Sequence, residues 1–575
     1  MSHDIAAPIL DIRDLRVRFV GHAGETEAVA GLSFSVAAGE AVALVGESGC
    51  GKSTVSLAIM QLLPKSAKLS GEIRFAGVNL IGEPGPTLRS LRGDKIAMIF
   101  QEPMTSLNPV QRVGTQIVEA IRSHRSMSRR EAWQRAIALL DLVQISSPAR
   151  RVYDYPHQLS GGQRQRVMIA MAIACEPKLL IADEPTTALD ATVQAQILEL
   201  LDSLRRKLGM GLLLITHDLS LVSRWTEKVV VMHHGQKMEQ LAAESLFTKG
   251  HHPYTRGLIA ASIRLDSGLH YRLKRLPEIR VRRDATDQYQ FLIEQPTLQR
   301  FTVDAKVPAT PVLKVKNLVV QYDTDQGPFT AVDDVSFSIA PGETLGLVGE
   351  SGSGKSSLSR SVLRLQPSHS GSILFHGTDI TRIAGENLRR ERQHMQMIFQ
   401  DPFGSLNPRH SVGDILEAPL AVHGVRDRFE RQRRIADILD KVGLPAAAGK
   451  RLPHEFSGGQ RQRIGIARAL ILKPSLVVCD EPVSALDVSV QAQILNLLAD
   501  LKQELNLSYL FISHDLAVVQ YISDRVIVLK SGKVVEENDH LNIWRSPHDP
   551  YTRALIEASA RKTSSAAAGV TGAWQ

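Results

Sequence analysis

Short apolar runs separated by polar turns are prominent in the chain. Residues 9–19 and 28–37 predict two strands, and residues 40–45 predict a buried strand that leads into a glycine-rich turn. Three later runs are apolar throughout, at residues 179–182, 211–215 and 229–233. Such strands, alternating with helices, are typical of a mostly parallel sheet that is covered on both faces. The pattern therefore predicts an α/β fold.

Between Gln101 and Ser160 the pattern becomes helical. Ser128 followed by Glu131 is a capping-box pattern, and the residues after it predict a helix that runs through Leu142. A matching helix is predicted at residues 428–442 in the second half of the chain. We therefore expect each sheet to contain an inserted helical subdomain.

The chain repeats itself once. The stretch GESGCGKST at residues 46–54 returns as GESGSGKSS at residues 349–357, which is 303 residues later. Motifs around Ser160, Asp183 and His217 return 297 residues further along. A period near 300 residues is too long for a solenoid, so the repeat indicates a duplicated domain.

The repeat divides the chain into two predicted domains, residues 1–263 and residues 313–563. Residues 264–312 carry several prolines and many charges without a clear period, which predicts a linker with a small accessory segment. Residues 564–575 are rich in Ser, Ala and Gly and are expected to form a disordered tail.

Each repeated glycine-rich stretch has the form of a phosphate-binding loop, G-x-x-x-x-G-K-[ST]. In such a loop backbone N–H groups surround the phosphates, the lysine places a cation on the outer phosphates, and the next hydroxyl, here Ser53 or Ser356, binds Mg²⁺. The expected ATP-binding residues of the two loops are Gly46, Glu47, Ser48, Gly49, Cys50, Gly51, Lys52, Ser53 and Thr54, and Gly349, Glu350, Ser351, Gly352, Ser353, Gly354, Lys355, Ser356 and Ser357.

Composition and charge narrow the class of protein. The chain has 43% apolar and 22% charged residues, as ordinary globular proteins do, and no apolar run approaches the ~18–20 residues that span a bilayer. The first residues lack the pattern of a signal peptide, and three cysteines cannot form a disulfide framework. We therefore expect a soluble, intracellular protein. The net charge of +8 fits a nucleic-acid partner, an anionic membrane or a solvated surface, and it does not decide between them.

The order of the motifs resembles that of the ATP-binding cassette (ABC) family, over almost the whole chain. A phosphate loop, Ser-Gly-Gly-Gln, Asp-Glu after an apolar run and a histidine after the next run occur twice in the same order. The resemblance implies two P-loop ATPase domains, or cassettes, that pair head-to-tail. Each cassette would have a mostly parallel sheet with an inserted helical subdomain.

The resemblance also implies roles for single residues around the loops. The implied Mg²⁺ residues, besides the two loop serines, are Gln101, Asp183, Gln400 and Asp480. The implied catalytic residues are Glu184 and Glu481, which orient and polarise the attacking water, and His217 and His514, which contact the γ-phosphate. Taken alone, the Asp-Glu pair also fits a cap for the next helix, and a lone histidine at a strand end is more often structural.

The Ser-Gly-Gly-Gln motifs fit a second phosphate-binding surface, because small residues followed by a helix present N–H groups to an anion. Their residues are Ser160, Gly161, Gly162 and Gln163, and Ser457, Gly458, Gly459 and Gln460. In the family this surface completes the ATP site of the opposite domain. The resemblance therefore implies two composite sites, and Asp190 and Asp487 match the loop that links them.

Three further positions have weaker support. Phe19 and Tyr322 each stand 27 residues before their phosphate loop, where the family places an aromatic ring against adenine. An aromatic residue that ends a strand is otherwise more often part of the core. Cys50 lies inside the first loop, where a nearby helix N-terminus lowers a thiol pKa, although a tolerated small residue is the simpler interpretation.

Two further motifs indicate transport. Ser-Leu-Asn-Pro follows Gln101 and Gln400, and both cassettes end in a motif like the His-Pro-Tyr-Thr that begins at His252. Both are similar to motifs of the bacterial dipeptide, oligopeptide, glutathione and nickel importers. This resemblance implies one fused chain per transporter, two transmembrane permease subunits, a periplasmic solute-binding protein and a peripheral location on the cytoplasmic face of the inner membrane. No iron–sulfur cluster is expected, because Cys50, Cys175 and Cys479 all lie within the cassettes.

The main alternative is a soluble tandem ATPase that acts on ribosomes or DNA. Such proteins usually carry a strongly basic linker. Residues 264–312 contain nine Lys or Arg against six Asp or Glu, so the linker is only weakly basic and a nucleic-acid partner is not expected. An exporter ATPase is a third alternative, which the two transport motifs disfavour.

Overall fold

The computed structural model describes residues 8–21, 24–101, 106–186, 189–265, 268–283, 289–297, 310–324, 327–484 and 486–560. The chain divides into two compact units, the first ending at Ile259 and the second beginning at Ala260. Each unit contains one of the two predicted cassettes. The predicted tail, residues 564–575, lies outside the described residues.

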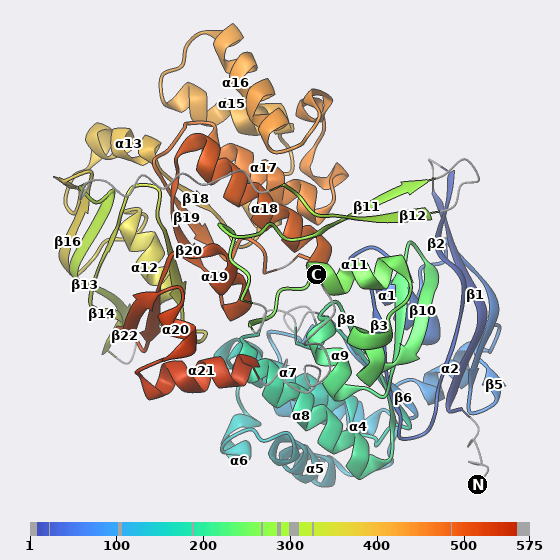
Figure 1. Cartoon of the computed structure of the whole chain (residues 1–575). Coiled ribbons are helices and arrows are strands. Elements are labelled where there is room, and N and C mark those ends of the chain that lie inside the picture. Colours follow the sequence, from blue (N-terminus) through green and yellow to red (C-terminus); the bar gives the residue numbers. More distant parts are fainter. Residues whose placement is uncertain are drawn as a thin grey trace. The chain divides into compact units, whose positions relative to one another are not determined.

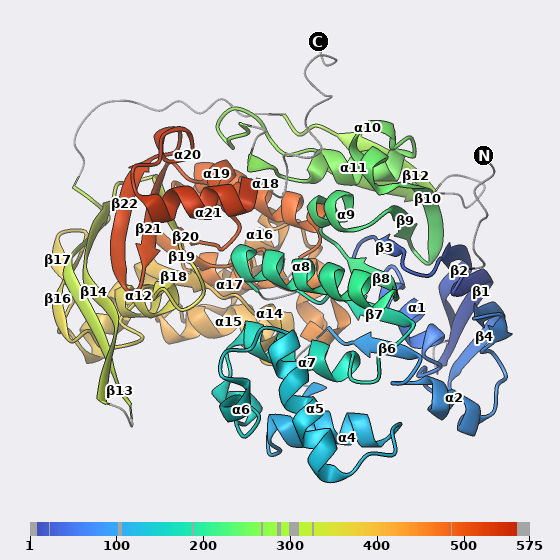
Figure 2. The same ribbon diagram turned by 90° about the horizontal axis from the view of Figure 1, so that it is seen from below.

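The central sheet of the first cassette has the strand order β10-β9-β3-β8-β7-β6 (Figures 1 and 2). Neighbouring strands are parallel except β9 and β10, so the mostly parallel sheet is confirmed. Strands β3, β7 and β8 are buried along their whole length, which explains why their sequences are apolar throughout. The strands are β3 (Ala41–Val45), β6 (Ile96–Ile99), β7 (Leu179–Asp183), β8 (Gly211–Thr216), β9 (Lys228–His233) and β10 (Gln236–Ala242).

A second, antiparallel sheet has the strand order β2-β1-β4-β5. Its strands are β1 (Leu10–Gly21), β2 (Gly24–Val36), β4 (Ala67–Phe75) and β5 (Val78–Asn79). The sequence predicted strands at β1 and β2 but not that they form a separate sheet. Helix α1 (Lys52–Ile59) joins the two sheets, because its Val55 packs in one apolar cluster with Val17 of β1 and Leu44 of β3.

The predicted helical subdomain lies between β6 and β7 and is confirmed (Figure 2). Ser128 and Glu131 form the expected capping box, and the helix after it ends at Leu142 as predicted. The subdomain consists of α4 (Val113–Arg122), α5 (Arg129–Leu142), α6 (Pro148–Arg151), the 3₁₀ turn η1 (Pro156–Gln158) and α7 (Gly161–Ala172). The other helical elements of this cassette are α2 (Gly85–Leu91), α8 (Ala191–Leu208), α9 (Leu219–Trp225), η2 (Ala243–Ser245), α10 (Leu246–Lys249) and α11 (Pro253–Ala261).

The second cassette repeats this architecture. Its central sheet has the order β18-β19-β20-β15-β21-β22, with strands β18 (Met395–Ile398), β19 (Leu476–Asp480), β20 (Ser508–Ile512), β15 (Thr344–Val348), β21 (Arg525–Lys530) and β22 (Lys533–Asp539). Its antiparallel sheet has the order β14-β13-β16-β17, with strands β14 (Gly327–Ile339), β13 (Leu313–Thr324), β16 (Ser370–Phe375) and β17 (Thr378–Asp379).

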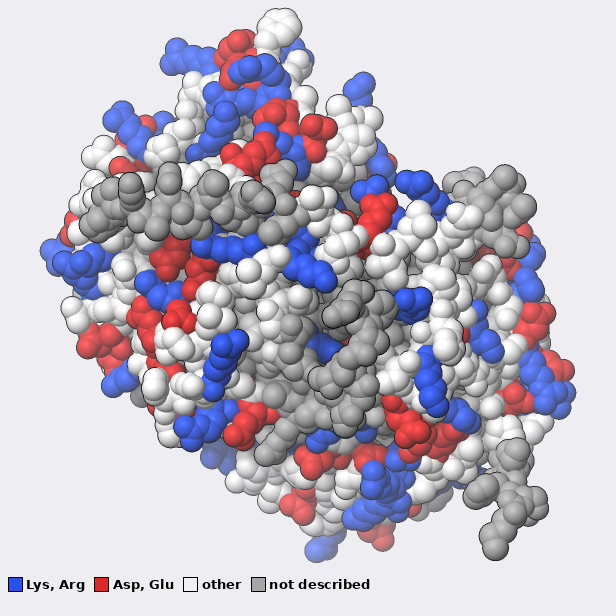
Figure 3. All heavy atoms as spheres, viewed as in Figure 1, with Lys and Arg blue, Asp and Glu red and all other residues white. Residues whose placement is uncertain are grey.

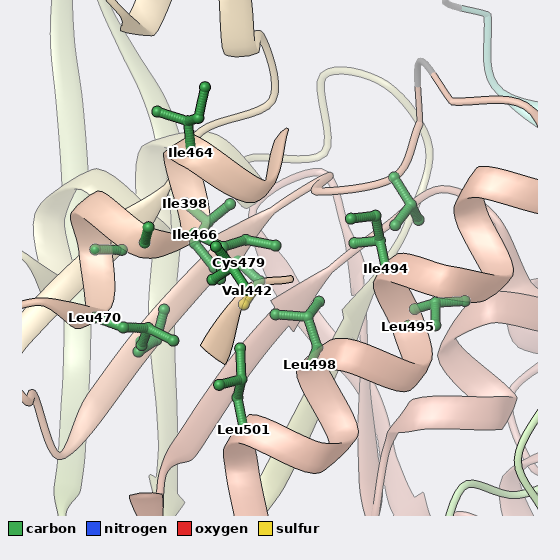
Figure 4. Packing of buried hydrophobic residues seen from close by; sticks show 14 of the residues in the cluster. Ile398, Val442, Ile464, Ile466, Leu470, Cys479, Ile494, Leu495, Leu498 and Leu501 are labelled. Atoms are coloured by element: carbon green, nitrogen blue, oxygen red, sulfur yellow. The ribbon is translucent and has the colours of Figure 1, made fainter. Parts of the chain in front are cut away.

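The helices of the second cassette follow the same order. They are α12 (Lys355–Val362), α13 (Gly385–His394), α14 (Pro402–Ser405), α15 (Val412–Val422), α16 (Arg428–Lys441), α17 (Gly458–Leu470), α18 (Val488–Leu505), α19 (Leu516–Ile522), α20 (Asn542–Arg545) and α21 (Pro550–Ala560), with 3₁₀ turns η4 (Ala446–Lys450) and η5 (Pro453–Glu455). The helix predicted at residues 428–442 is therefore confirmed. Cys479 of β19 lies inside the apolar core with Leu470 of α17 and Leu498 of α18 (Figure 4).

The segment between the cassettes is more ordered than its sequence pattern indicates. Strands β11 (Glu278–Arg283) and β12 (Tyr289–Glu294) form an antiparallel hairpin, with Glu278 opposite Glu294 (Figure 1). Tyr271 and Leu276 are fully buried in the apolar core of the second cassette. The segment thus packs on the second cassette over much of its described length.

Two observations concern the surface and the membrane. On the face shown in Figure 3, basic and acidic side chains are interspersed. Among the residues that the structure describes, no helix combines the length and the apolar composition needed to cross a membrane.

His270 makes the stability of the second cassette dependent on pH. Burial lowers its pKa to about 4, with the nearby charges of His540 and Arg272 acting in the same direction and Asp524 opposing them. The unfolded chain protonates this histidine near pH 6.5, so below that pH the unfolded state binds more protons than the folded state. We expect the free energy of unfolding to fall by up to about 3 kcal/mol between pH 6.5 and 4.

Chemical denaturation at a series of pH values measures this effect. The variant His270→Gln keeps a side-chain donor but has no group that titrates in this range. Its unfolding free energy should fall less steeply over the same interval. Equal pH slopes for the variant and the parent chain would contradict the assignment to His270.

Candidate active site

Both glycine-rich loops join a buried strand to a helix, as a phosphate-binding loop does. The first connects β3 to α1, and the second connects β15 to α12. Lys52 Nζ donates to the carbonyl oxygens of Gly46 and Glu47 at 2.7 and 2.8 Å. Lys355 Nζ donates to the matching carbonyls at 2.8 and 2.7 Å. Each loop therefore wraps around the side chain of its own lysine and places two backbone carbonyl groups against its ammonium group.

Glycine is required at the start and the end of each loop. Gly46 and Gly349 have φ angles of +155° and +153°, and a Cβ atom there would lie 2.3 Å from Met232 O and 2.2 Å from Leu529 O. Gly51 and Gly354 cap helices α1 and α12 at a φ of 102°. The close backbone packing leaves no space for a side chain, so the loop shape is fixed by neighbouring strands.

Asp183 and Asp480 lie at the ends of β7 and β19 and are buried. Ser56 Oγ donates to Asp183 Oδ2 at 3.2 Å, and the hydroxyl of Ser53 also bonds to this carboxyl. Burial raises the pKa of Asp183, and burial together with the charge of Glu481 raises the pKa of Asp480 to about 6. Burial thus disfavours the charged form of each carboxylate, which a bound cation would stabilise.

These groups fit a divalent cation. Within the described residues, Asp183 Oδ1 is buried without a hydrogen-bond partner. A buried carboxylate oxygen beside a serine hydroxyl is a set of oxygen ligands that suits Mg²⁺. The structure thus brings together Ser53 and Asp183, two of the residues predicted to hold the ion.

Two other predicted residues contact each predicted catalytic glutamate. Glu184 Oε2 accepts a hydrogen bond from Gln101 Nε2 at 2.9 Å, and Glu184 Oε1 lies 3.3 Å from His217 Nδ1. These residues follow three different strands, β6, β7 and β8, which are neighbours in the parallel sheet. Their carboxyl ends therefore lie at one edge of the sheet, where ligands of open α/β sheets bind.

The second cassette has the same arrangement. Gln400 Nε2 donates to Glu481 Oε2 at 2.8 Å, and His514 Nδ1 lies 3.1 Å from the same oxygen. Both glutamates also have left-handed backbone angles, with φ of 47° at Glu184 and 49° at Glu481. Non-glycine residues rarely adopt this conformation, and such strain concentrates at functional sites.

The Glu481–His514 pair holds opposite charges. Burial opposes both charges, but the hydrogen bond and the charge of His514 outweigh it and lower the pKa of Glu481. In the same way Glu481 outweighs burial and raises the pKa of His514. The pair therefore favours a carboxylate beside an imidazolium, a combination that can accept a hydrogen bond from water and donate one to a phosphate.

The N-cap of the helix that follows the Asp-Glu pair is a different residue in both cassettes. Asp190 is the N-cap of α8, and its Oδ1 accepts a hydrogen bond from Val193 N at 2.9 Å. Asp487 stands at the N-cap of α18. The alternative in which the Asp-Glu pair caps these helices therefore does not hold, and the aspartates implied to link the two sites occupy the N-cap positions.

The Ser-Gly-Gly-Gln motifs begin α7 and α17. Ser160 forms a capping box with Gln163, and Ser457 forms one with Gln460. Each motif therefore forms the capped N-terminus of its helix. A Cβ atom on Gly162 would lie 2.7 Å from Val193 Cγ1, and one on Gly459 would lie 2.4 Å from Val490 Cγ1. The first serine and glycine of both motifs are exposed, so their surface is available to an anion.

The two aromatic candidates differ in their surroundings. Phe19 is partly buried against the core of the first cassette. Tyr322 is 37% exposed, and its hydroxyl bonds to Ser357 Oγ at 2.9 Å at the end of the second loop. Tyr322 therefore lies beside the phosphate loop, while Phe19 retains the features of a core residue. Stacking on adenine stays a prediction for both.

Cys50 occupies the same place as Ser353. Each is buried with 4% exposure, and a Cβ atom on the first loop glycine would lie 2.7 Å from the sulfur or the hydroxyl. We therefore expect Cys50→Ser to leave ATP affinity unchanged in a binding titration. Our hypothesis is that alkylation of Cys50 blocks the first site and that ATP protects it. Unchanged inhibition of Cys50→Ser by a thiol reagent would contradict it.

One contact near the loops was missed from the sequence. Glu350 N donates to Tyr551 Oη at 3.1 Å, so the Tyr of the second terminal motif binds the phosphate loop directly. In the first cassette Tyr254 packs on His233, whose Nδ1 lies 3.8 Å from Glu47 Oε2. The recurring tyrosine beside each loop was visible in the sequence, but its partner was not.

A buried strand, a glycine-rich loop that encloses a lysine, and an acidic strand end beside it define a P-loop nucleotide-binding protein. The profile of the family described as "ABC transporter" matches residues 29–187 and 332–484. The chain belongs to the ABC transporter family, and each of its two cassettes is an ATP-binding, ATP-hydrolysing domain. A second profile, "Oligopeptide/dipeptide transporter, C-terminal region", matches residues 238–288 and 535–571.

Similar proteins cover nearly the whole chain. A "Glutathione import ATP-binding protein GsiA" of Pectobacterium atrosepticum is 47% identical over 96% of this chain and 89% of its own length. Proteins with the same name from Escherichia coli and Shigella boydii are 46% identical over 96% of this chain and 90% of theirs. A solved bacterial ABC transporter cassette is 28% identical, covers 40% of this chain and 98% of its own, and has a TM-score of 0.37.

Proposed function

We propose that the chain is the ATPase subunit of a bacterial importer that takes up glutathione or similar short peptides through permease subunits. The observation that carries the proposal is the 47% identity to a glutathione import ATP-binding protein over 96% of the chain. The oligopeptide/dipeptide transporter region at the end of both cassettes supports the same substrate class. In this proposal a periplasmic binding protein delivers the peptide, and the chain acts at the cytoplasmic face of the membrane.

We further propose that two ATP molecules bind in composite sites. One site would combine Lys52 and Glu184 of the first cassette with residues 457–460 of the second. The other would combine Lys355 and Glu481 with residues 160–163. The exposed helix N-termini of α7 and α17 support this assignment, since they are suited to a phosphate that a second domain brings to them. Fusion in one chain raises the effective concentration of each half-site for the other.

Within each site the chain's own residues bind ATP and activate water. The loop lysine and the backbone N–H groups hold the β- and γ-phosphates, and the glutamate carboxylate orients the attacking water. The histidine donates a hydrogen bond toward the γ-phosphate and keeps the glutamate in place through their mutual contact. When bound, Mg²⁺ neutralises charge on the phosphates. Ser53, Ser356, Asp183 and Asp480 are the residues that would hold it, with Gln101 and Gln400 beside them.

Transport in reconstituted vesicles tests this function. The chain is coexpressed with two permease subunits of a glutathione importer, reconstituted with the binding protein of that importer, and supplied with labelled glutathione, a labelled dipeptide or nickel. We expect ATP-dependent uptake of glutathione or the dipeptide, and no uptake with the double variant Glu184→Gln/Glu481→Gln. Uptake of nickel alone would contradict the peptide substrate. Copurification with ribosomes in place of permeases would contradict the importer assignment.

A further inference from the structure

The described residues 268–283 and 289–297 between the cassettes, here called the arm, hold the end of helix α19. Tyr271 N donates to the carbonyl of Tyr521 at 2.9 Å, and His270 Nε2 lies 3.0 Å from the carbonyl oxygen of Ser523. Carbonyl groups at a helix C-terminus have no partner within the helix. The arm supplies such partners at the end of α19 and thereby stabilises its last turn.

The arm also reaches a buried ion pair. Tyr271 Oη lies 2.6 Å from Lys502 Nζ and 3.0 Å from Asp524 Oδ1, while Lys502 Nζ lies 3.0 Å from Asp524 Oδ2. Asp524 in turn accepts a hydrogen bond from Thr344 N at 2.9 Å, at the first residue of β15. Burial lowers the pKa of Lys502 to about 8, with Asp524 opposing the shift. Each buried polar group here is costly to leave unpaired, so the Tyr271 hydroxyl is an integral member of the network.

Two further contacts fix the arm along helix α18. Asn496 accepts a hydrogen bond from Leu276 N at 3.0 Å and donates one to Leu276 O at 2.9 Å. Arg275, whose side chain is almost fully buried, donates to Asp500 Oδ1 at 3.0 Å. The amide of Asn496 thus pairs with both backbone groups of one arm residue, as a neighbouring strand would. Only a side chain with both a donor and an acceptor can do this.

The first cassette lacks the residues that receive the arm. At the positions 297 residues earlier, Asn496, Asp500, Lys502 and Asp524 correspond to Glu199, Ser203, Arg205 and Glu227. A glutamate in place of Asn496 has no donor for a backbone carbonyl. Arg205 and Glu227 pair directly at 3.2 Å, and Glu227 Oε2 accepts from Ala41 N at the start of β3. Arg205 and Glu227 are longer than Lys502 and Asp524, so they connect α8 to β3 without a tyrosine hydroxyl between them.

We propose that the arm is a positioning element of the second ATP site alone. It holds α19, which begins two residues after His514, and it holds Asp524 against β15, which leads directly into the loop at Gly349. Tyr271 and Asn496 are its principal positioning residues. The proposal rests on the role proposed above for His514. It makes hydrolysis at one of two otherwise matching sites dependent on the segment that connects the cassettes.

Hydrogen–deuterium exchange of the full chain tests the contact itself. In Asn496→Glu, which installs the residue of the first cassette, we expect exchange in the arm to rise about three- to tenfold, the factor for the loss of one or two net hydrogen bonds. Exchange in α19 should rise as well, since Tyr521 Oη donates to Asn496 Oδ1 at 3.1 Å in addition to the arm contacts. Exchange in α9, the matching helix of the first cassette, should not change. Unchanged protection of the arm, or an equal rise in α9, would overturn the proposal.

Steady-state ATP hydrolysis tests the consequence. We expect kcat of Asn496→Glu to fall by up to about twofold, because the change affects one of two matching sites. KM for ATP should stay nearly constant, since misplaced groups slow the reaction more than they weaken binding. The control Glu199→Asn, the mirror substitution at an exposed position of α8, should leave both constants unchanged. A loss of protection in the arm without a loss of kcat would overturn the positioning role.

Tyr271→Phe provides a second, milder variant. It keeps the ring in the core and removes only the hydroxyl contacts to Arg272, Lys502 and Asp524. It should lower kcat in the same direction and lower the unfolding midpoint, since buried groups lose a partner. Leu273→Ala, at a 71% exposed position of the arm, is the matched control and should have no effect. These measurements do not involve peptide uptake. A failure of transport with an intact arm effect would therefore count against the proposed function only.

Discussion

Replacing Glu481 with glutamine is expected to remove most ATP hydrolysis at the second site and to leave ATP binding intact. Glutamine has the same shape and keeps an acceptor oxygen, but it lacks the negative charge that polarises water. Loss of a positioned general base typically costs about 100- to 10,000-fold in rate. The contact of Glu481 with His514 at 3.1 Å adds a second consequence, since the charge of Glu481 contributes to the raised pKa of that histidine. In the variant the pKa of His514 should fall.

Phosphate release and ATP titration separate the two expected effects. The exposed Glu386 on α13 offers a matched Glu→Gln control outside the site. Glu386→Gln should behave as the parent chain in both measurements. Glu184→Gln should reproduce the result of Glu481→Gln, because the same contacts surround both glutamates. Normal turnover in either site variant would contradict the assigned catalytic role.

The site geometry follows from the sheet because each residue stands at the end of a strand. Gln101, Glu184 and His217 are far apart in the chain, but each follows an apolar run. Once these runs are placed in one parallel sheet, their carboxyl ends must meet at a single edge. The resemblance to the ABC family thus implied which residues share a site, and the strand ends explain why they meet. The sequence did not predict the left-handed backbone of Glu184, because that conformation depends on neighbouring strands.

The arm could not be predicted in the same way. Its strands β11 and β12 are only six residues each and pair with one another. Such short strands give too few positions for a clear alternation of apolar and polar residues. Its strongest contacts join Tyr271 and Leu276 to residues more than 200 positions away. Local periodicity contains no information about such partners. A signal did exist, since the receiving residues Asn496 and Asp500 differ from their counterparts although the surrounding helices match.

The difference between the cassettes changes what the duplication means. Both sites retain the same loop, acidic pair and histidine, so the chemistry that each site can perform is the same. The residues that support the two sites differ. The second cassette relies on the arm, whereas the first relies on the pair of Arg205 and Glu227. Identical catalytic residues can therefore work at different rates if their supports differ in rigidity.

Substituting alanine for Gly349 is expected to weaken ATP binding at the second site. The new Cβ atom would lie 2.2 Å from Leu529 O and 2.7 Å from Ser353 Oγ. The first of these atoms is strand backbone and cannot move aside, so the loop itself must shift. Overpacking of this kind costs about 1–3 kcal/mol, which is about 5- to 150-fold in an equilibrium constant. A shift of the loop would also displace the carbonyl that binds Lys355 at 2.8 Å.

Calorimetric titration with ATP measures this loss, and Gly342→Ala separates it from general strain. Gly342 also has a left-handed φ, of 70°, but its nearest neighbour to an added Cβ is a side-chain atom 3.5 Å away and it lies outside the loop. Gly342→Ala should lower the free energy of unfolding by the cost of a left-handed alanine, about 1–2 kcal/mol, and leave the ATP affinity unchanged. A lower free energy of unfolding for Gly349→Ala together with the full ATP affinity would contradict the claim that the rigid backbone around the loop shapes the phosphate site.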